Sequence, residues 1–289
     1  MGEALTTLTN SREDLRTRVR STLARLSRTG ALPTLPAAAS AALGIARNPE
    51  ADLDDLCRVI QTDMGLAARL LRVANSAAVG RRRPARKLSE AVITVGLRRT
   101  CDILVAACAK RLYEGSTARA EELWNHALAV GVAAEELARV TRKVDVGSAF
   151  LPGLFHDVGR VAFLLADPTV AEVIDGLVIS GQEPSSLERE WYGFDHAEVG
   201  AILAEEWGLA LELCDAIRWH HAPAEAGAAR NLATILNAAD RLAYTIGCGS
   251  SAEPPASVTL VHLGLSPEDE IACAERVQSA WQQQRDFLA

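Results

Sequence analysis

Apolar residues recur every three or four positions along most of this 289-residue chain. Leu15, Val19, Leu23 and Leu26 form one such series, and their spacing predicts an N-terminal helix within residues 1–30. Strict alternation of apolar and polar residues, which is typical of half-buried strands, is rare. The pattern therefore predicts an all-α fold.

Residues suited to cap helices support several of the predicted elements. Asp63 precedes an apolar helical series and can accept a hydrogen bond from the first backbone N–H groups. Asp195 is followed three residues later by Glu198, a pair that resembles a capping box. The segment RRRPARK after Gly80 predicts a loop. Further helices are predicted near residues 53–60, 66–73, 91–110, 118–140, 147–165, 168–179, 195–206, 209–221, 228–246 and 267–286.

Composition divides the chain into two parts. All 13 aromatic residues lie at or after Tyr113, and all six histidines lie at or after His126. Residues 1–110 carry 18 basic and 10 acidic side chains, a net charge of +8, whereas residues 111–289 carry 12 and 27, a net charge of −15. We therefore expect two helical lobes. The predicted units are an N-terminal helix (1–30), an N-terminal helical bundle (31–113), a histidine-bearing helical lobe (114–250) and a C-terminal helical extension (251–289).

The overall composition excludes several classes of protein. Hydrophobic residues make up 49% and charged residues 23%, so the chain can bury a large core. No apolar run reaches the roughly 18–20 residues of a membrane span, and the first residues lack the pattern of a secretory signal. Six cysteines without a CxxC pair predict reduced thiols. We expect a cytoplasmic protein that does not contact a membrane.

Basic residues of the first part, in Arg81–Arg83, Arg86–Lys87 and Arg98–Arg99, are of the kind that contacts phosphates. However, residues 1–110 contain no aromatic side chain to stack on bases, and the whole chain has a net charge of −7. Nucleic acid is therefore the less favoured partner.

Histidines and carboxylates form the main candidate site. Five of the six histidines fall into the short segments LWNHA, LFHDVG, FDHAEVG and WHHAP. Imidazole and carboxylate groups are ligands of Fe, Mn and Zn. Glu122 precedes His126 by four residues and so shares its helix face, and Asp240 lies on a later predicted helix. The candidate ligands are Glu122, His126, His156, Asp157, His196, His220, His221 and Asp240.

The adjacent pair His156–Asp157 suggests that these ligands could hold two metal ions. A carboxylate can bridge two ions, which a single imidazole nitrogen cannot. Two ions about 3.5–4 Å apart can activate a water molecule and hold a phosphate during in-line displacement. We expect one to three divalent ions.

With these histidine segments, the sequence resembles the HDOD family, a subgroup of the HD-domain superfamily. The resemblance runs from about Leu32 to about Asp240. It begins with LPTLP, continues through IQTDMGLAARLLRVANSA and LSEAVITVGLRR, and ends in the histidine segments with ELWNHALAVG, LPGLFHDVGRV, FDHAEVGAILAEEWGL and AIRWHH.

The resemblance implies a bacterial, all-helical signalling module with an HD-like second lobe. HDOD proteins are regarded as output or scaffold modules without an established common activity. The resemblance also identifies an HD signature and the extra ligands of the related HD-GYP phosphodiesterases. The signature corresponds here to His126, His156, Asp157 and Asp240, and the extra ligands to His196, His220, His221 and Glu122.

Two departures from HD-GYP enzymes bear on function. Arg160 stands where those enzymes usually have Lys, and the segment after His221 reads APAEAGAARN, without a GYP motif. The favoured hypothesis is a regulatory module that acts by binding a signalling protein or a ligand and retains a metal site. The alternative is a metal-dependent phosphohydrolase acting on nucleotide or cyclic-dinucleotide phosphoesters, with Asp157 and Arg160 in catalysis. A homodimer through the N-terminal or C-terminal helix remains a further hypothesis.

Overall fold

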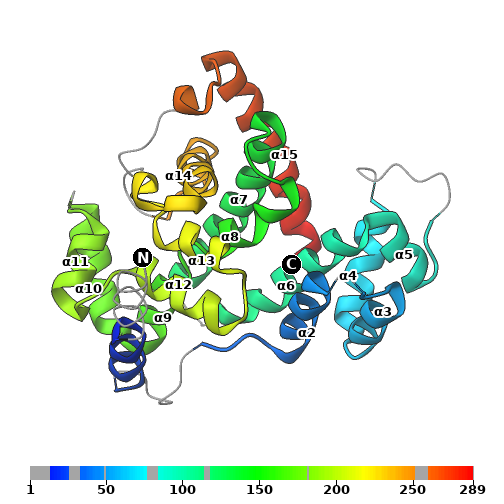
Figure 1. Ribbon diagram of the computed structural model, residues 1–289, viewed down its shortest axis with the longest axis horizontal. Coiled ribbons are helices and arrows are strands. Elements are labelled where there is room, and N and C mark those ends of the chain that lie inside the picture. Colours follow the sequence, from blue (N-terminus) through cyan, green and yellow to red (C-terminus); the bar gives the residue numbers. More distant parts are fainter. Residues whose placement is uncertain are drawn as a thin grey trace, which may run out of the picture.

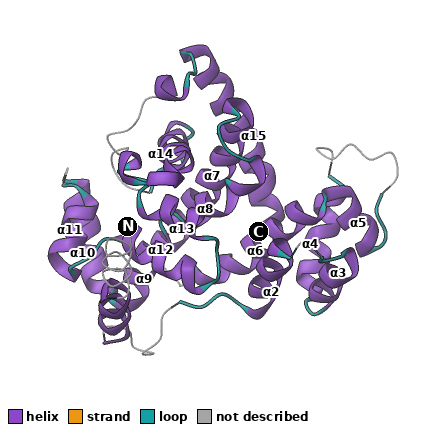
Figure 2. Cartoon of the chain, viewed as in Figure 1, coloured by secondary structure: helices purple, strands orange, loops and turns teal. Residues whose placement is uncertain are grey.

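The structure is a computed structural model in which helices form the regular structure (Figure 2). No strand occurs within the residues that it describes, which confirms the predicted all-α class. The described residues are 14–25, 33–48, 50–76, 84–113, 118–180, 182–250 and 260–288. Arg81–Arg83 and residues 114–117, at the expected start of the histidine-bearing lobe, lie outside them.

The first group of helices, here called the N-terminal lobe, follows the apolar spacing closely. α2 packs along α6, and α3 packs against α4 and α5 (Figure 1). Asp63 caps α4, as predicted, because its carboxylate accepts hydrogen bonds from the N–H groups of Gly65 at 2.8 Å and Leu66 at 3.3 Å. The helices are α2 (Ala37–Arg47), α3 (Leu53–Gln61), α4 (Met64–Ala74), α5 (Leu88–Val95) and α6 (Leu97–Ala109).

Two features of this lobe differ from the sequence prediction. The single helix expected over 91–110 is wrong, because Gly96 has φ 91°, a conformation that side chains disfavour, and divides it into α5 and α6. α2 was not predicted. Its buried face consists of Ala39, Ala42 and Leu43, and small residues give a weak periodic signal.

The second group, here called the histidine lobe, surrounds one long central helix. α7 packs against both α8 and α14, and α12 packs against α9 and α13 (Figure 1). Asp195 and Glu198 form the predicted capping box at the start of α12. The helices are α7 (Ala118–Thr141), α8 (Phe150–Phe155), α9 (Val158–Ala166), α10 (Pro168–Ile179), α11 (Pro184–Tyr192), α12 (His196–Glu206), α13 (Leu211–Arg218) and α14 (Arg230–Thr245).

The helix predicted over 147–165 is interrupted at His156–Asp157, between α8 and α9. Among the described residues, the stretch Val146–Ala166 passes a test of length and hydropathy for crossing a membrane, although no such run was expected from the sequence. Most of its side chains are buried inside the protein. It thus serves as the core of the histidine lobe, and the interruption turns a histidine and an aspartate inward.

The terminal segments pack against these groups of helices. α15 (Pro267–Leu288) packs along α7, and its last turn accepts hydrogen bonds from Arg72 at 3.3 Å and Lys110 at 3.0 Å, both from the N-terminal lobe. Helical residues 14–25 dock on the histidine lobe, where Val19 is fully buried. All six cysteines are buried and free, in agreement with the expectation of reduced thiols.

Candidate metal centre

Four parts of the histidine lobe bring candidate ligands together. His126 projects from the middle of α7, and Asp240 projects from α14. His156 and Asp157 occupy the interruption between α8 and α9. The remaining ligands are His196, the first residue of α12, and the His220–His221 pair in the turn after α13.

The first ligand group contains His126, His156 and Asp240, all buried. Nε2 of His126 lies 3.3 Å from Nε2 of His156 and 3.3 Å from Oδ1 of Asp240. Two imidazole nitrogens and one carboxylate oxygen at these separations can share a transition-metal ion.

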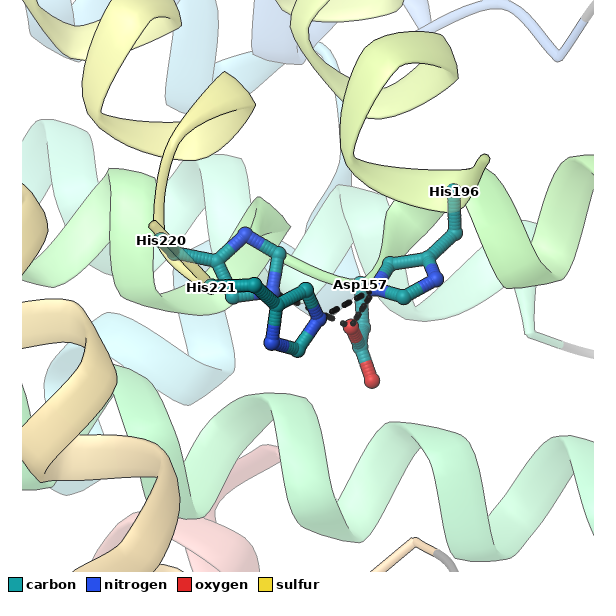
Figure 3. Close-up of side chains that lie close together, drawn as sticks. All are labelled: Asp157, His196, His220 and His221. Atoms are coloured by element: carbon teal, nitrogen blue, oxygen red, sulfur yellow. Dashed lines mark hydrogen bonds and ion pairs between the residues drawn. The ribbon is translucent and has the colours of Figure 1, made fainter. Parts of the chain in front are cut away.

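The second ligand group contains Asp157, His196, His220 and His221, and its rings converge on the carboxylate (Figure 3). Nε2 of His196 lies 3.2 Å from Oδ1 of Asp157 and 2.9 Å from Nε2 of His221. Nε2 of His220 lies 3.8 Å from the same carboxylate oxygen. This group is of the same nitrogen and oxygen type as the first.

Asp157 lies between the two groups. Its Oδ1 is 3.5 Å from Nε2 of His156, and its Oδ2 is 3.8 Å from Nε2 of His126, both in the first group. The carboxylate therefore faces both groups at once, which is the position expected of a bridging ligand.

Hydrogen bonds on the other ring nitrogen determine how each histidine points. Nδ1 of His126 lies 2.8 Å from the carbonyl oxygen of Cys248, and Nδ1 of His156 lies 2.8 Å from that of Gly153. Nδ1 of His220 lies 2.6 Å from the carbonyl oxygen of Ile217. Since a carbonyl only accepts, each Nδ1 carries a proton, and each Nε2 faces the centre, where it can bind a cation when it carries no proton itself.

A buried ring nitrogen tests whether the residues present fit a metal. Among the residues that the structure describes, Nε2 of His220 has no hydrogen-bond partner. Such an atom is costly to bury unless something else binds it. A cation between the rings and the carboxylates would bind it, so the residues present fit a metal ion.

The electrostatics favour the protonation states that metal binding requires. Burial lowers the pKa of His156, and burial together with the neighbouring histidines lowers the pKa of His220 to about 3. Burial alone would raise the pKa of Asp157, but the charge of Arg160 and the nearby histidines hold it below its usual range. At neutral pH, His156 and His220 are therefore neutral and Asp157 is ionised.

Nearby carboxylates counteract the effect of burial on the pKa of His126 and His196. Burial lowers the pKa of His126, but the carboxylate of Asp240 outweighs this effect and raises it. Burial also lowers the pKa of His196, and the carboxylate of Glu188 on α11 raises it above its usual value. Binding of a cation at these rings would displace any proton from Nε2.

Glu122 is the predicted ligand that the structure does not bring to the centre. Its side chain is 60% exposed and pairs with Arg119 at 3.3 Å. The i, i+4 spacing places Glu122 on the same face of α7 as His126, but one turn nearer the helix start, where the face reaches the surface. Helical spacing alone could not show that His126 is buried whereas Glu122 is exposed.

Arg160 lies beside the centre, as its position after His156–Asp157 suggested. Its Nε is 3.4 Å from Oδ2 of Asp157 and 3.9 Å from Oε1 of Glu188. Burial opposes its charge, but these carboxylates raise its pKa further, so it remains a cation. It places a positive charge next to the bridging carboxylate.

Glu188 contacts a candidate ligand, and the sequence analysis did not identify it. It lies on α11, a helix that was not predicted, and its Oε2 is 2.6 Å from Nδ1 of His196. The sequence did contain a weak signal for α11. Its first residue is Pro184, and proline is common at the first position of a helix.

A glycine allows α9 and α12 to approach closely at the centre. A Cβ added at Gly159 would lie 2.1 Å from the carbonyl oxygen of His196. Any side chain at this position would push the start of α12, and with it His196, away from Asp157.

A model of the HDOD domain matches residues 32–223, so the chain belongs to the HDOD family. An uncharacterised protein of Treponema pallidum (strain Nichols) is 31% identical over 192 residues. That match covers 66% of this chain but 37% of the relative.

Solved structures share the fold. An HDOD domain protein of unknown function from Geobacter sulfurreducens has a TM-score of 0.74 at 24% identity, covering 94% of this chain and 97% of its own. A predicted phosphohydrolase from Shewanella amazonensis SB2B has a TM-score of 0.67 at 25% identity, covering 89% and 95%. A predicted signal transduction protein from Marinobacter aquaeolei VT8 has a TM-score of 0.73 at 23% identity, covering 96% and 66%.

Proposed function

We propose that this chain is a regulatory HDOD module of the bacterial cytoplasm whose histidine lobe binds two divalent metal ions. The observation that carries the metal site is the convergence of Nε2 atoms on Asp157, with Nε2 of His220 left without a hydrogen-bond partner among the described residues. Nitrogen and oxygen ligands of this kind suit Fe, Mn or Zn. The bound ions would hold α7, the α8–α9 interruption, α12 and α14 together, and so fix the surface that the module presents to a signalling partner.

The experiment is elemental analysis of protein purified with and without air, for the wild type, His156→Ala and Glu122→Ala. We expect about two equivalents of Fe, Mn or Zn in the wild type, fewer in His156→Ala, and an unchanged content in Glu122→Ala, whose side chain faces solvent. Folded, metal-free wild-type protein from both preparations would contradict the proposal.

Phosphoester hydrolysis is a second candidate, supported by the position of Asp157 and by a cavity beside His221. A cavity of about 590 Å³ reaches His221 and is large enough for a nucleotide-sized ligand. When bound, two metal ions can supply an activated water and stabilise the charge on a phosphate. Asp157 would bridge them, and Arg160 would add positive charge beside the phosphate.

The lining of this cavity bears on the substrate. It includes Glu183, Asp195, Glu198 and Glu225 but only two arginines, so it favours a substrate with few negative charges. Bis(p-nitrophenyl) phosphate, a monoanionic diester, and a cyclic dinucleotide are the substrates to compare. Turnover that is lost in Asp157→Asn and greater on the smaller diester supports this candidate. Absence of turnover by fully metal-loaded protein would contradict the hydrolase candidate and leave only the regulatory function.

A further inference from the structure

A separate pocket of about 310 Å³ lies where the N-terminal lobe meets α7 and α15. Its walls come from α4, α5, α6, α7 and α15, which belong to both halves of the chain. None of the candidate metal ligands lines it. Its volume matches the lower end of the range, about 300–1,000 Å³, that small-molecule sites occupy.

One part of the pocket is apolar. Val73 of α4, Val95 of α5, Ile103 of α6, Val132 of α7 and Phe287 of α15 contribute to its wall. Apolar side chains from five helices can cover a hydrocarbon body on several sides.

The other part of the pocket is a chain of alternating charges. Arg99 pairs with Glu135 at 2.5 Å, and Arg139 pairs with the same carboxylate at 3.0 Å. Arg139 also pairs with Glu136, which Arg276 of α15 reaches at 2.5 Å. Three guanidinium groups thus share two carboxylates. Burial keeps the neighbouring Asp102 protonated below its raised pKa of about 7, so below pH 7 this network of side chains has an excess of one positive charge.

Two of these cations are accessible, because the side chains of Arg139 and Arg276 are 55% and 49% exposed. Ser76 lines the same pocket, and its buried Oγ has no hydrogen-bond partner among the residues that the structure describes. A hydroxyl group and an excess guanidinium charge beside an apolar wall are the groups that recognise a carboxylate on a hydrocarbon chain.

We propose that this pocket binds a small amphiphilic monoanion, namely a medium-chain carboxylate. The hydrocarbon lies against the apolar wall, and the carboxylate offsets the excess charge of Arg99, Arg139 and Arg276. The inference goes beyond the proposed metal function and does not rest on it. Because its walls come from both lobes and from α15, the bound ligand stabilises their docked arrangement.

The test is isothermal titration calorimetry of the full chain with octanoate, octylammonium and 1-octanol as probes. We expect octanoate to bind with one-to-one stoichiometry, and at least tenfold more tightly than octylammonium or 1-octanol, since the charge must be matched. Arg139→Gln should weaken octanoate binding about three- to tenfold by removing the excess charge. The exposed Arg58→Gln on α3 is the matched control and should leave it unchanged.

A second pair of variants tests the location. Ala280→Trp on α15 fills the pocket and should reduce octanoate affinity at least tenfold. Ser279→Trp adds the same side chain to an exposed position of the same helix and should have no effect. Binding that is absent, equal for the three probes, or undiminished by Ala280→Trp in folded protein would overturn the proposal. The metal content of each variant is measured alongside, so failure of this site is distinguishable from failure of the metal site.

Discussion

Oε2 of Glu188 lies 2.6 Å from Nδ1 of His196 and 2.8 Å from the backbone nitrogen of the same residue. One buried carboxylate therefore fixes both the ring and the first turn of α12. Because its Nδ1 faces an acceptor, the ring presents Nε2 to Asp157. The second ligand group thus depends on a residue that is not itself one of its ligands.

Glu188→Gln should weaken the second metal site. The neutral amide holds the His196 ring less firmly and makes it a poorer electron donor, so affinity for one ion should fall about 10–100-fold. Titration with a competing chelator measures this change. Glu190→Gln, an exposed carboxylate two residues later on the same helix, is the control and should bind as the wild type does. Equal affinities in both variants would show that Glu188 does not position the ring.

The two ligand groups should lose their ions separately. Asp240→Asn should empty the first group, because it replaces the group's carboxylate, and His221→Ala should weaken the second. Each variant should therefore retain about one equivalent of metal in elemental analysis. Complete loss of metal in both variants would instead indicate a single cooperative site.

Gly159→Ala should damage both stability and the metal site. Its new methyl group would meet the carbonyl oxygen of His196, and overpacking of this kind costs about 1–3 kcal/mol. Urea unfolding and metal content measure the two effects. Gly176→Ala on α10 is the matched control, since a Cβ there meets no atom within 4 Å, and it should be neutral or stabilising by up to about 1 kcal/mol. A fully stable, metal-loaded Gly159→Ala protein would refute the close approach.

Asp102 on α6 should make stability decrease with rising pH. Burial raises its pKa from 3.8 to about 7, against the opposing charges of Arg99 and Arg98. Between these pH values the folded chain holds a proton that the unfolded chain has lost. The stability that the proton on Asp102 gives the folded chain is therefore fully present below about pH 4 and is lost as the pH rises through 7.

The neutral isostere Asp102→Asn should remove that dependence. Relative to the wild type, its free energy of unfolding should increase by about 3 kcal/mol between pH 5 and pH 8. Urea titrations at the two pH values measure the difference. Asp54→Asn, at an exposed position on α3, serves as the control. A constant difference between Asp102→Asn and the wild type would contradict the raised pKa.

The sequence predicted the fold class and most helices of the histidine lobe because their apolar spacing is strong. It could not predict α2, whose buried face includes Ala39 and Ala42, or the division at Gly96, where backbone conformation overrides the apolar pattern. It identified the residues that the structure brings together as two ligand groups, since rare histidines mark them. Glu122 and Glu188 show the limit: local spacing places a residue on a helix face, but tertiary packing decides which carboxylate is buried beside a ring.

The most direct test of the two-metal centre is anomalous diffraction from crystals of the metal-loaded protein, recorded at the absorption edges of Fe, Mn and Zn. We expect two peaks on either side of the Asp157 carboxylate, about 3.5–4 Å apart. One should contact His126, His156 and Asp240, and the other His196, His220 and His221. A map without a peak at Asp157, from crystals in which these side chains keep their positions, would contradict the assignment.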